Sequence, residues 1–258
     1  MTTQTTTSKL ERPILMSPMM VEAIMAGRKT KTRRELKGLP DEDDAFSFTK
    51  MVIDPEIADP DSIDDEIVPM VLYGTCAEFN KGEWVIKCPF GSVGDILWIK
   101  ETTWWEKGKD FTNVAFKDGT MITMKAGKQN KTMKIPDWKP TDKKIWKGRP
   151  SMFMPKTLCR LRLEITSIRV ERLHDITEED AIKEGVMFYD DPTKVRRYKD
   201  YLSNAKGYGD SQHDYPSLPT AKKSFESLWE SINGKGSHAK NQWVWVIEFK
   251  VVKNNINQ

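Results

Sequence analysis

The residue types that could do chemistry are concentrated in one short segment, residues 26–34 (Ala-Gly-Arg-Lys-Thr-Lys-Thr-Arg-Arg). Its cations could bind a phosphate group, or one of its hydroxyls could act as a nucleophile beside an amine base. The residues before it predict a helix over 17–26, with Ser17 as the N-cap, Pro18 at the first helical position and Gly27 at the end. The basic segment therefore begins where a helix stops.

The two threonines favour an extended backbone from residue 30 onward, and a strand places alternate side chains on opposite faces. One face would carry Thr30, Thr32 and Arg34, and the other would carry Lys29, Lys31 and Arg33. If Lys29 lies in the turn after Gly27, its long side chain could still reach the Thr32 side.

A second segment with chemical potential is the predicted helix over 177–184. Thr177 followed three residues later by Asp180 is a variant capping box, and Gly185 is a stop signal. Glu184 falls in the last turn, where the helix dipole disfavours a carboxylate. It is therefore either an exposed acid tolerated at a cost of about 0.3–1 kcal/mol, or an acid with a partner cation or a tightly held proton.

Composition limits the class of protein. With 258 residues, 38% hydrophobic and 31% charged, the chain can bury a sizeable core. No run approaches the roughly 18 apolar residues of a membrane helix, and the first residues lack a signal-peptide core, so we expect a cytoplasmic protein with no membrane partner. Its three Cys and three His are not at metal-ligand spacing, so we predict no metal site.

The net charge of +3 is small, but it is unevenly distributed. Acidic residues gather between 41 and 66, and basic residues between 107 and 147, where they alternate with Trp138 and Trp146. Such interleaving can bind single-stranded nucleic acid. A solvated surface hairpin with partly buried Trp is the simpler interpretation of the same pattern.

Strand-like segments are spread along the whole length, and helices are predicted only at 17–26, 177–184 and 221–232. The predicted strands cover 82–87, 95–100, 160–170 and 242–251. This order favours an α+β fold in which a closed or nearly closed barrel carries a few helices.

These elements resemble, in their order, the ASCH domain family of the PUA-like superfamily. The matching parts are residues 24–34, the turn into a strand at 94–97, the helix ending at Glu184 and the terminal strand 243–249. The resemblance implies a PUA-like mixed β-barrel formed by a single domain over 1–258. That domain would have a frayed N-terminus at 1–10, an acidic insertion at 38–80, a basic insertion at 106–148 and a loop insertion at 187–220.

The resemblance extends to the compact bacterial N4-acetylcytidine amidohydrolases of that family, and it implies Lys29, Thr32 and Glu184 as catalytic residues. The implied reaction removes an acyl group from the exocyclic N4 amide of acylated cytosine or cytidine, without metal or cofactor. Thr32 would be the nucleophile, Lys29 its base, and Glu184 would orient the lysine and shuttle the proton. Alternatively, Glu184 would be the base acting on water and Lys29 would stabilise the oxyanion.

Substrate contacts are predicted from residue type. Arg34 and Arg33 could hold the substrate or the oxyanion, although Arg34 could equally bridge to an acid such as Glu101. A pyrimidine base could stack on Trp98, Phe153 or Trp104, although large aromatics beside strands usually fill the core.

The partner would be a small nucleoside, with RNA also possible, and the protein would be a monomer or a small homo-oligomer. The main alternative is a non-catalytic PUA-like module that reads RNA or a modified base, with phosphate contacts from the basic segments. A third hypothesis, a phage assembly or structural factor, rests only on the resemblance to longer phage-encoded members of the family.

Overall fold

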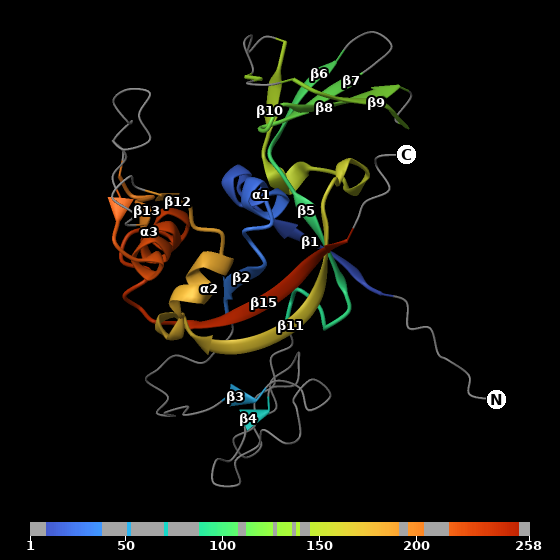
Figure 1. Cartoon of the computed structure of the whole chain (residues 1–258). Helices are drawn as coiled ribbons and strands as arrows, with labels where there is room; N and C mark the ends of the chain where they lie inside the picture. The colour runs from blue at the N-terminus through green and yellow to red at the C-terminus, as the bar shows by residue number, and fades with distance from the viewer. Residues whose placement is uncertain are drawn as a thin grey trace, which may run out of the picture. The chain divides into compact units, whose positions relative to one another are not determined.

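A computed structural model describes residues 9–37, 51–52, 70–71, 88–107, 112–125, 128–135, 138–139, 145–190, 196–203 and 217–252 (Figure 1). The chain divides into two compact units. Unit 1 comprises residues 1–27, 95–164 and 251–258, and unit 2 comprises residues 28–94 and 165–250. The fold is α+β, with most of the regular structure in sheets and few helices.

Unit 1 contains a short mixed sheet next to the first helix. Strand β1 (Glu11–Leu15) runs parallel to β5 (Ile96–Lys100), and the start of β11 (Arg162–Arg172) runs antiparallel to β5. Helix α1 (Pro18–Met25) follows β1, begins after Ser17 and ends before Gly27, whose φ of 71° is typical of glycine. The helix predicted over 17–26 is therefore confirmed.

The lysine-rich residues around 107–147 build a second, antiparallel sheet in unit 1 with the order β10-β6-β7-β8-β9. It is larger than the hairpin that the sequence suggested. The bounds are β6 Thr103–Lys107, β7 Thr112–Phe116, β8 Thr120–Lys125, β9 Lys128–Lys134 and β10 Lys147–Arg149. Its turn at Gly119 has a φ of 83°, and a Cβ there would lie 2.0 Å from the carbonyl oxygen of Ile135, so this close approach requires glycine.

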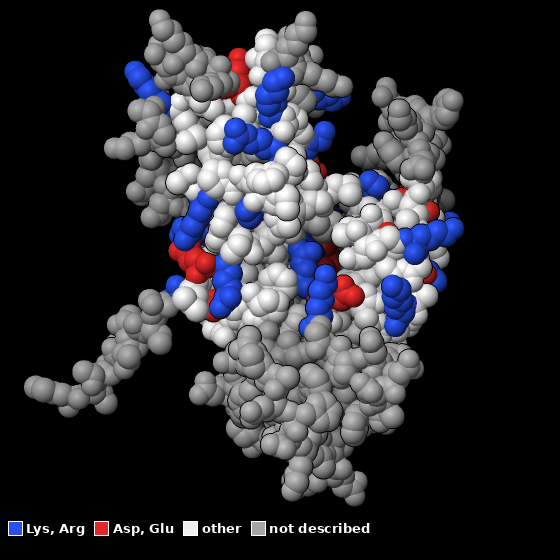
Figure 2. Space-filling model, turned by 180° about the vertical axis from the view of Figure 1, so that it is seen from behind, with Lys and Arg blue, Asp and Glu red and all other residues white. Residues whose placement is uncertain are grey.

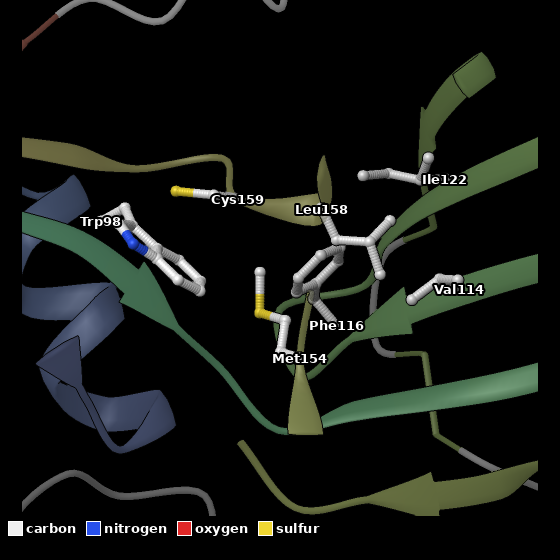
Figure 3. Close-up of a cluster of buried hydrophobic side chains, with 7 residues drawn as sticks. All are labelled: Trp98, Val114, Phe116, Ile122, Met154, Leu158 and Cys159. Carbon is white, nitrogen blue, oxygen red and sulfur yellow. The ribbon is translucent and has the colours of Figure 1, made fainter. Parts of the chain in front are cut away.

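One face of this second sheet packs into the hydrophobic core of unit 1, shown in Figure 3. Its side chains point toward one another from the sheet, from β5 and from the segment with the short 3₁₀ helices Ser151–Phe153 and Lys156–Leu158. The members of the cluster are Trp98, Val114, Phe116, Ile122, Met154, Leu158 and Cys159.

Unit 2 is built around three strands and two helices. The rest of β11, strand β15 (Trp243–Val252) and strand β2 (Lys31–Glu35) lie in the order β11-β15-β2. Helices α2 (Glu178–Lys183) and α3 (Ala221–Asn233) contact each other, and the backbone N–H of Ala221 donates to Glu178 Oε2 at 2.8 Å. That carboxylate satisfies a free donor at the start of α3.

Three short strands complete the regular structure of unit 2 that lies between α2 and α3. They are β12 (Phe188–Asp190), β13 (Arg196–Lys199) and β14 (Ser217–Leu218), which form one antiparallel sheet in the segment predicted as a loop insertion. Tyr198 of β13 is buried, so this small sheet contributes to the core of unit 2. The 3₁₀ helix Leu173–Asp175 connects β11 to the residues before α2.

The described strands do not close into the predicted barrel. Strand β1 is an edge in unit 1, and β2 is an edge in unit 2. The three predicted helices and the strands at 95–100, 160–170 and 242–251 are confirmed within one or two residues at most ends.

Some predictions fall on residues that the structure does not describe. The predicted strand at 82–87 lies outside the described residues, as does the acidic segment 38–80 apart from the paired strands β3 (Met51–Val52) and β4 (Met70–Val71). At the N-terminus, residues 1–8 lie outside. Leu10 is held in place by its N–H, which donates to Asp95 Oδ1 at 3.0 Å.

Candidate active site

The end of helix α2 positions Glu184. The helix runs over 178–183, Glu184 is its C-cap, and Gly185 follows with a φ of 87°. The segment before β2 supplies donors to the exposed carbonyls of this helix end, because the Thr30 N–H donates to the Lys183 carbonyl at 2.9 Å. Residues 26–34 and the end of helix α2 are thus joined directly, although Lys29 and Glu184 are 155 residues apart in sequence.

Lys29 makes the central contact of this site. Its Nζ lies 2.8 Å from Glu184 Oε2 and 2.8 Å from the Glu184 backbone carbonyl oxygen. Both residues are buried, with exposed fractions of 3% for Lys29 and 4% for Glu184. Glu184 is therefore a buried acid with a cationic partner, as one of the two sequence interpretations required.

Arg33 binds the other oxygen of the same carboxylate, with Nη1 3.1 Å from Glu184 Oε1. Its guanidinium also donates to Glu171 and, at 2.9 Å, to Asp180 Oδ2. Its Cζ lies 5.8 Å from the centroid of the Phe225 ring of α3. Arg33 is thus fixed on three sides by carboxylates, and it balances the charge of Glu184 independently of Lys29.

Asp180 is a member of this network that the sequence interpretation missed. Its backbone N–H donates to Thr177 Oγ1, as the capping prediction required, but its carboxylate accepts from Lys31 at 2.7 Å, Arg33 at 2.9 Å and Arg169 at 2.9 Å. These donors hold the pKa of Asp180 below its ordinary value, although burial alone would raise it. The signal was available, because Asp180 and Glu184 are four residues apart and so share one helix face.

Lys31 pairs with two acids of the network and does not contact Glu184 among the described contacts. Its Nζ lies 2.7 Å from Asp180 Oδ1 and 2.7 Å from Glu248 Oε1, and Glu248 is its register partner in β15. Burial alone would lower the pKa of Lys31, but these two acids outweigh it and raise that pKa. Lys31 is therefore held as a cation.

Lys29 differs electrostatically from Lys31. Burial lowers the pKa of Lys29, and the nearby Arg34 and Arg33 lower it further, while Glu184 opposes these effects without outweighing them. The amine of Lys29 therefore loses a proton more readily than the amine of an ordinary lysine.

Thr32 and Arg34 alternate with Lys31 and Arg33 along β2, as predicted. Thr32 is buried, with 3% of its surface exposed. Arg34 is close enough to interact electrostatically with both Lys29 and Glu184, and burial lowers the pKa of its guanidinium. The site therefore joins Lys29, Arg33 and Glu184 by direct contacts, whereas Thr32 lies in β2 on the opposite face from Arg33.

The other predicted substrate contacts belong to unit 1. Glu101 is bound through both oxygens by Arg160, at 2.8 Å and 2.6 Å, so its partner is Arg160 and not Arg34. Trp98 is buried in the hydrophobic cluster, as expected of an aromatic residue beside a strand. Phe153 is 64% exposed and could stack on a ring.

Among the described residues, no group of three or more His, Cys, Asp or Glu side chains has the geometry to hold a metal ion. No helix in the described part of the chain is long and apolar enough to cross a membrane. No family model matches the chain, and comparisons with curated proteins and with solved structures gave no significant match.

Proposed function

We propose that this protein is a metal-independent amidohydrolase that removes the acyl group from the exocyclic N4 amide of acylated cytidine. Lys29, Thr32 and Glu184 are the proposed catalytic residues, and Arg34 is the proposed contact to the oxyanion. The choice of substrate rests on the resemblance of the sequence to the ASCH domain family. From the same resemblance we propose a PUA-like fold, and from the absence of a long apolar run in the sequence we propose a cytoplasmic location.

The observation that carries the proposal is the pair of contacts at Lys29 Nζ. A neutral amine has two N–H donors, and Glu184 supplies two acceptors, its backbone oxygen and Oε2, both at 2.8 Å. With both donors engaged, the lone pair is left to accept a proton. Arg33 supports this state, because its permanent charge balances Glu184 when Lys29 is neutral.

The proposed reaction begins with attack of the Thr32 hydroxyl on the carbonyl carbon of the acyl group, while Lys29 takes the hydroxyl proton. The oxyanion of the tetrahedral intermediate faces Arg34. The proton then passes to the exocyclic nitrogen, the C–N bond breaks, and cytidine leaves. Water hydrolyses the ester on Thr32 to release the carboxylic acid. Catalytic hydrogen bonds are often formed only with substrate bound, so the contact between the Thr32 hydroxyl and Lys29 is expected in the substrate complex.

The contacts favour Lys29 over Glu184 as the base. Glu184 Oε2 accepts from Lys29 and Oε1 accepts from Arg33, so both carboxylate oxygens are already engaged. Neither oxygen is therefore free to take a proton from water without first losing one of these contacts. Glu184 is thus best placed to orient the amine.

The test is ultraviolet detection of cytidine released from N4-acetylcytidine in chelator-treated buffer. The wild type should turn over, whereas Lys29→Met, Thr32→Ala and Glu184→Gln should each lose at least about 100-fold in kcat/KM. Lys31→Met is the matched control, because it removes a neighbouring amine that does not contact Glu184, and it should keep most of the activity. A wild type that is inert on nucleoside and base with several acyl groups would refute the proposal and favour the non-catalytic base-binding alternative.

A further inference from the structure

Tyr201, just after strand β13, lies next to the two segments that form the candidate active site. Its hydroxyl oxygen accepts a hydrogen bond from the Met187 N–H at 2.9 Å, and Met187 is three residues beyond Glu184. Burial raises the pKa of this hydroxyl, and Arg28, which directly precedes Lys29, is close enough for its charge to oppose the rise. The Lys29–Glu184 contact joins the segments that carry these groups, so Tyr201 and Arg28 lie beside that pair.

The Tyr201 hydroxyl is a fixed hydrogen-bond donor. A phenol oxygen that accepts from a backbone N–H still carries its own hydrogen, which it can donate to a second group. The raised pKa keeps that hydrogen in place at neutral pH, because an ordinary tyrosine loses it only near about pH 10. The backbone N–H of Tyr201 donates to Ser227 Oγ of α3 at 3.1 Å, so both ends of the residue are anchored.

One face of the β12-β13-β14 sheet combines cations with tyrosine next to Tyr201. Register pairs share a face, so Tyr189 of β12 lies beside Arg197 of β13, and Lys199, two residues further along β13, is on the same side. The Lys199 Nζ lies 5.2 Å from the centroid of the Tyr201 ring. Arg197 is exposed, and the other three side chains and Arg28 are half-buried, so each keeps some contact with solvent.

The three basic side chains of this group give the surface a positive charge. The neighbouring acid Asp200 is engaged by the Leu202 N–H, which donates to its Oδ1 at 2.9 Å. Figure 2 shows that Lys and Arg are more numerous than Asp and Glu on the described surface that it draws. An uncharged nucleoside gains little from such surroundings, whereas a phosphate is attracted by them and can be bound by a guanidinium through two parallel hydrogen bonds.

We propose that Arg28 and the Tyr201 hydroxyl bind a phosphate group on the ribose of the substrate, so that the natural substrate is an acylated cytidine nucleotide. This choice of substrate rests on the proposed function, because the phosphate site lies beside Lys29 and Glu184. Arg28 supplies a charge with paired N–H donors, Tyr201 supplies one O–H donor, and Lys199 adds to the attraction at longer range. A free nucleotide and an RNA strand both contain such a phosphate ester, and the test separates these two sources.

The test is isothermal titration calorimetry of the full chain with cytidine, cytidine 5′-monophosphate and cytidine 3′-monophosphate. Binding of these product-like ligands does not depend on turnover. The wild type should bind one of the two monophosphates roughly 10- to 100-fold more tightly than cytidine, which is the usual effect of hydrogen bonds to a charged group. Equal affinities for cytidine and both monophosphates would overturn the proposal.

Variants then assign the preference for the phosphate to its residues. Arg28→Gln should remove most of it, and Arg28→Lys should restore a part, because lysine keeps the charge without the paired donors. Tyr201→Phe should lower it about 2- to 10-fold through the loss of one hydrogen bond. Lys235→Gln removes an exposed lysine of unit 2 beyond α3, so it is the matched charge control and should leave the preference unchanged.

A preference that survives Arg28→Gln, or that falls equally in Lys235→Gln, would overturn the phosphate site. Circular dichroism checks that each variant is folded, and if Arg28→Gln does not fold, Arg28→Lys and Tyr201→Phe carry the same test. The trinucleotide ApCpA identifies the source of the phosphate. It should bind at least as tightly as the better monophosphate if the source is RNA, and more weakly if the source is a free nucleotide.

Hydrolysis of N4-acetylcytidine and of its phosphate esters is measured on the same proteins. A phosphate preference that depends on Arg28, in a protein that hydrolyses none of these compounds, would refute the proposed function and leave the phosphate site standing. Hydrolysis without any phosphate preference, in binding or in kcat/KM, would overturn the phosphate site and leave the proposed function standing. The two proposals therefore fail separately.

Discussion

Two substitutions of the cations that bind Glu184 should differ in their effects: Arg33→Met should mainly lower stability, and Lys29→Met should mainly lower activity. Arg33→Met removes the shared partner of Glu171, Asp180 and Glu184. Removing one member of a buried ion pair costs about 3–5 kcal/mol of unfolding free energy, because the remaining charge is buried without compensation. At about 2–4 °C per kcal/mol for a chain of this size, Tm should fall by roughly 6–20 °C.

Lys29→Met should be far milder for stability. Glu184 keeps Arg33 at 3.1 Å, so no carboxylate is left unpaired, and methionine fills a similar volume in a buried position. The lost hydrogen bonds and the gain from removing a buried amine nearly cancel, so the change should stay within about 1 kcal/mol, or about 4 °C. Hydrolysis, in contrast, should fall by at least about 100-fold.

The assay combines thermal unfolding followed by circular dichroism with N4-acetylcytidine hydrolysis well below Tm. Lys31 is a neighbouring lysine that Asp180 and Glu248 hold as a cation, so Lys31→Met measures the stability lost when a charged buried lysine is removed. A Tm loss for Lys29→Met as large as that for Arg33→Met would refute the reasoning. Lys29 would then be a charged structural partner of Glu184.

Further predictions concern the nucleophile, the loss of stability at acidic pH and the β7–β8 turn. Thr32→Ser should keep measurable hydrolysis and Thr32→Ala should not; equal activity of the two in the cytidine-release assay would exclude an attacking hydroxyl. The pKa values of Asp180 and Glu248 are lowered in the folded state, so their stabilisation is complete above the unfolded values of 3.8 and 4.5 and is lost as the pH falls below those values through the lower folded-state pKa values. Asp180→Asn should therefore flatten the dependence of the urea midpoint on pH below about 5, and an unchanged dependence would contradict this. Gly119→Ala should lower Tm, since its Cβ would lie 2.0 Å from the Ile135 carbonyl oxygen, and an unchanged Tm would show that the turn relaxes freely.

Local signals in the sequence predicted most of the regular elements. Thr177, whose hydroxyl accepts from the Asp180 N–H, and the stops at Gly27 and Gly185 are local signals that predict the two short helices. Ser17 is the N-cap residue of α1 but makes no side-chain capping bond, so Pro18 at the first helical position is the local signal there. The partner cation of Glu184 was also foreseen as one of two possibilities, since a carboxylate at a helix C-terminus needs compensation.

What the sequence could not predict depends on long-range pairing. Asp180 looked like a capping residue, but its carboxylate meets Lys31, Arg33 and Arg169, which β2 and β11 bring to it from distant parts of the chain. Strand alternation likewise cannot show whether a set of strands closes, so the barrel was expected where the described strands leave β1 and β2 as edges. For residues 107–147 a surface hairpin was the simpler of two interpretations, and the five-stranded sheet found there depends on pairings that no single segment shows.

The most direct test of the central claim is the pH dependence of kcat/KM for N4-acetylcytidine, measured in chelator-treated buffer. If neutral Lys29 is the base, activity should rise with pH through an apparent pKa below 10.5, the ordinary lysine value, because burial lowers the pKa of this amine. Lys29→Met should abolish that limb together with the activity. Absence of hydrolysis by the wild type, or a limb that persists in Lys29→Met, would contradict the account.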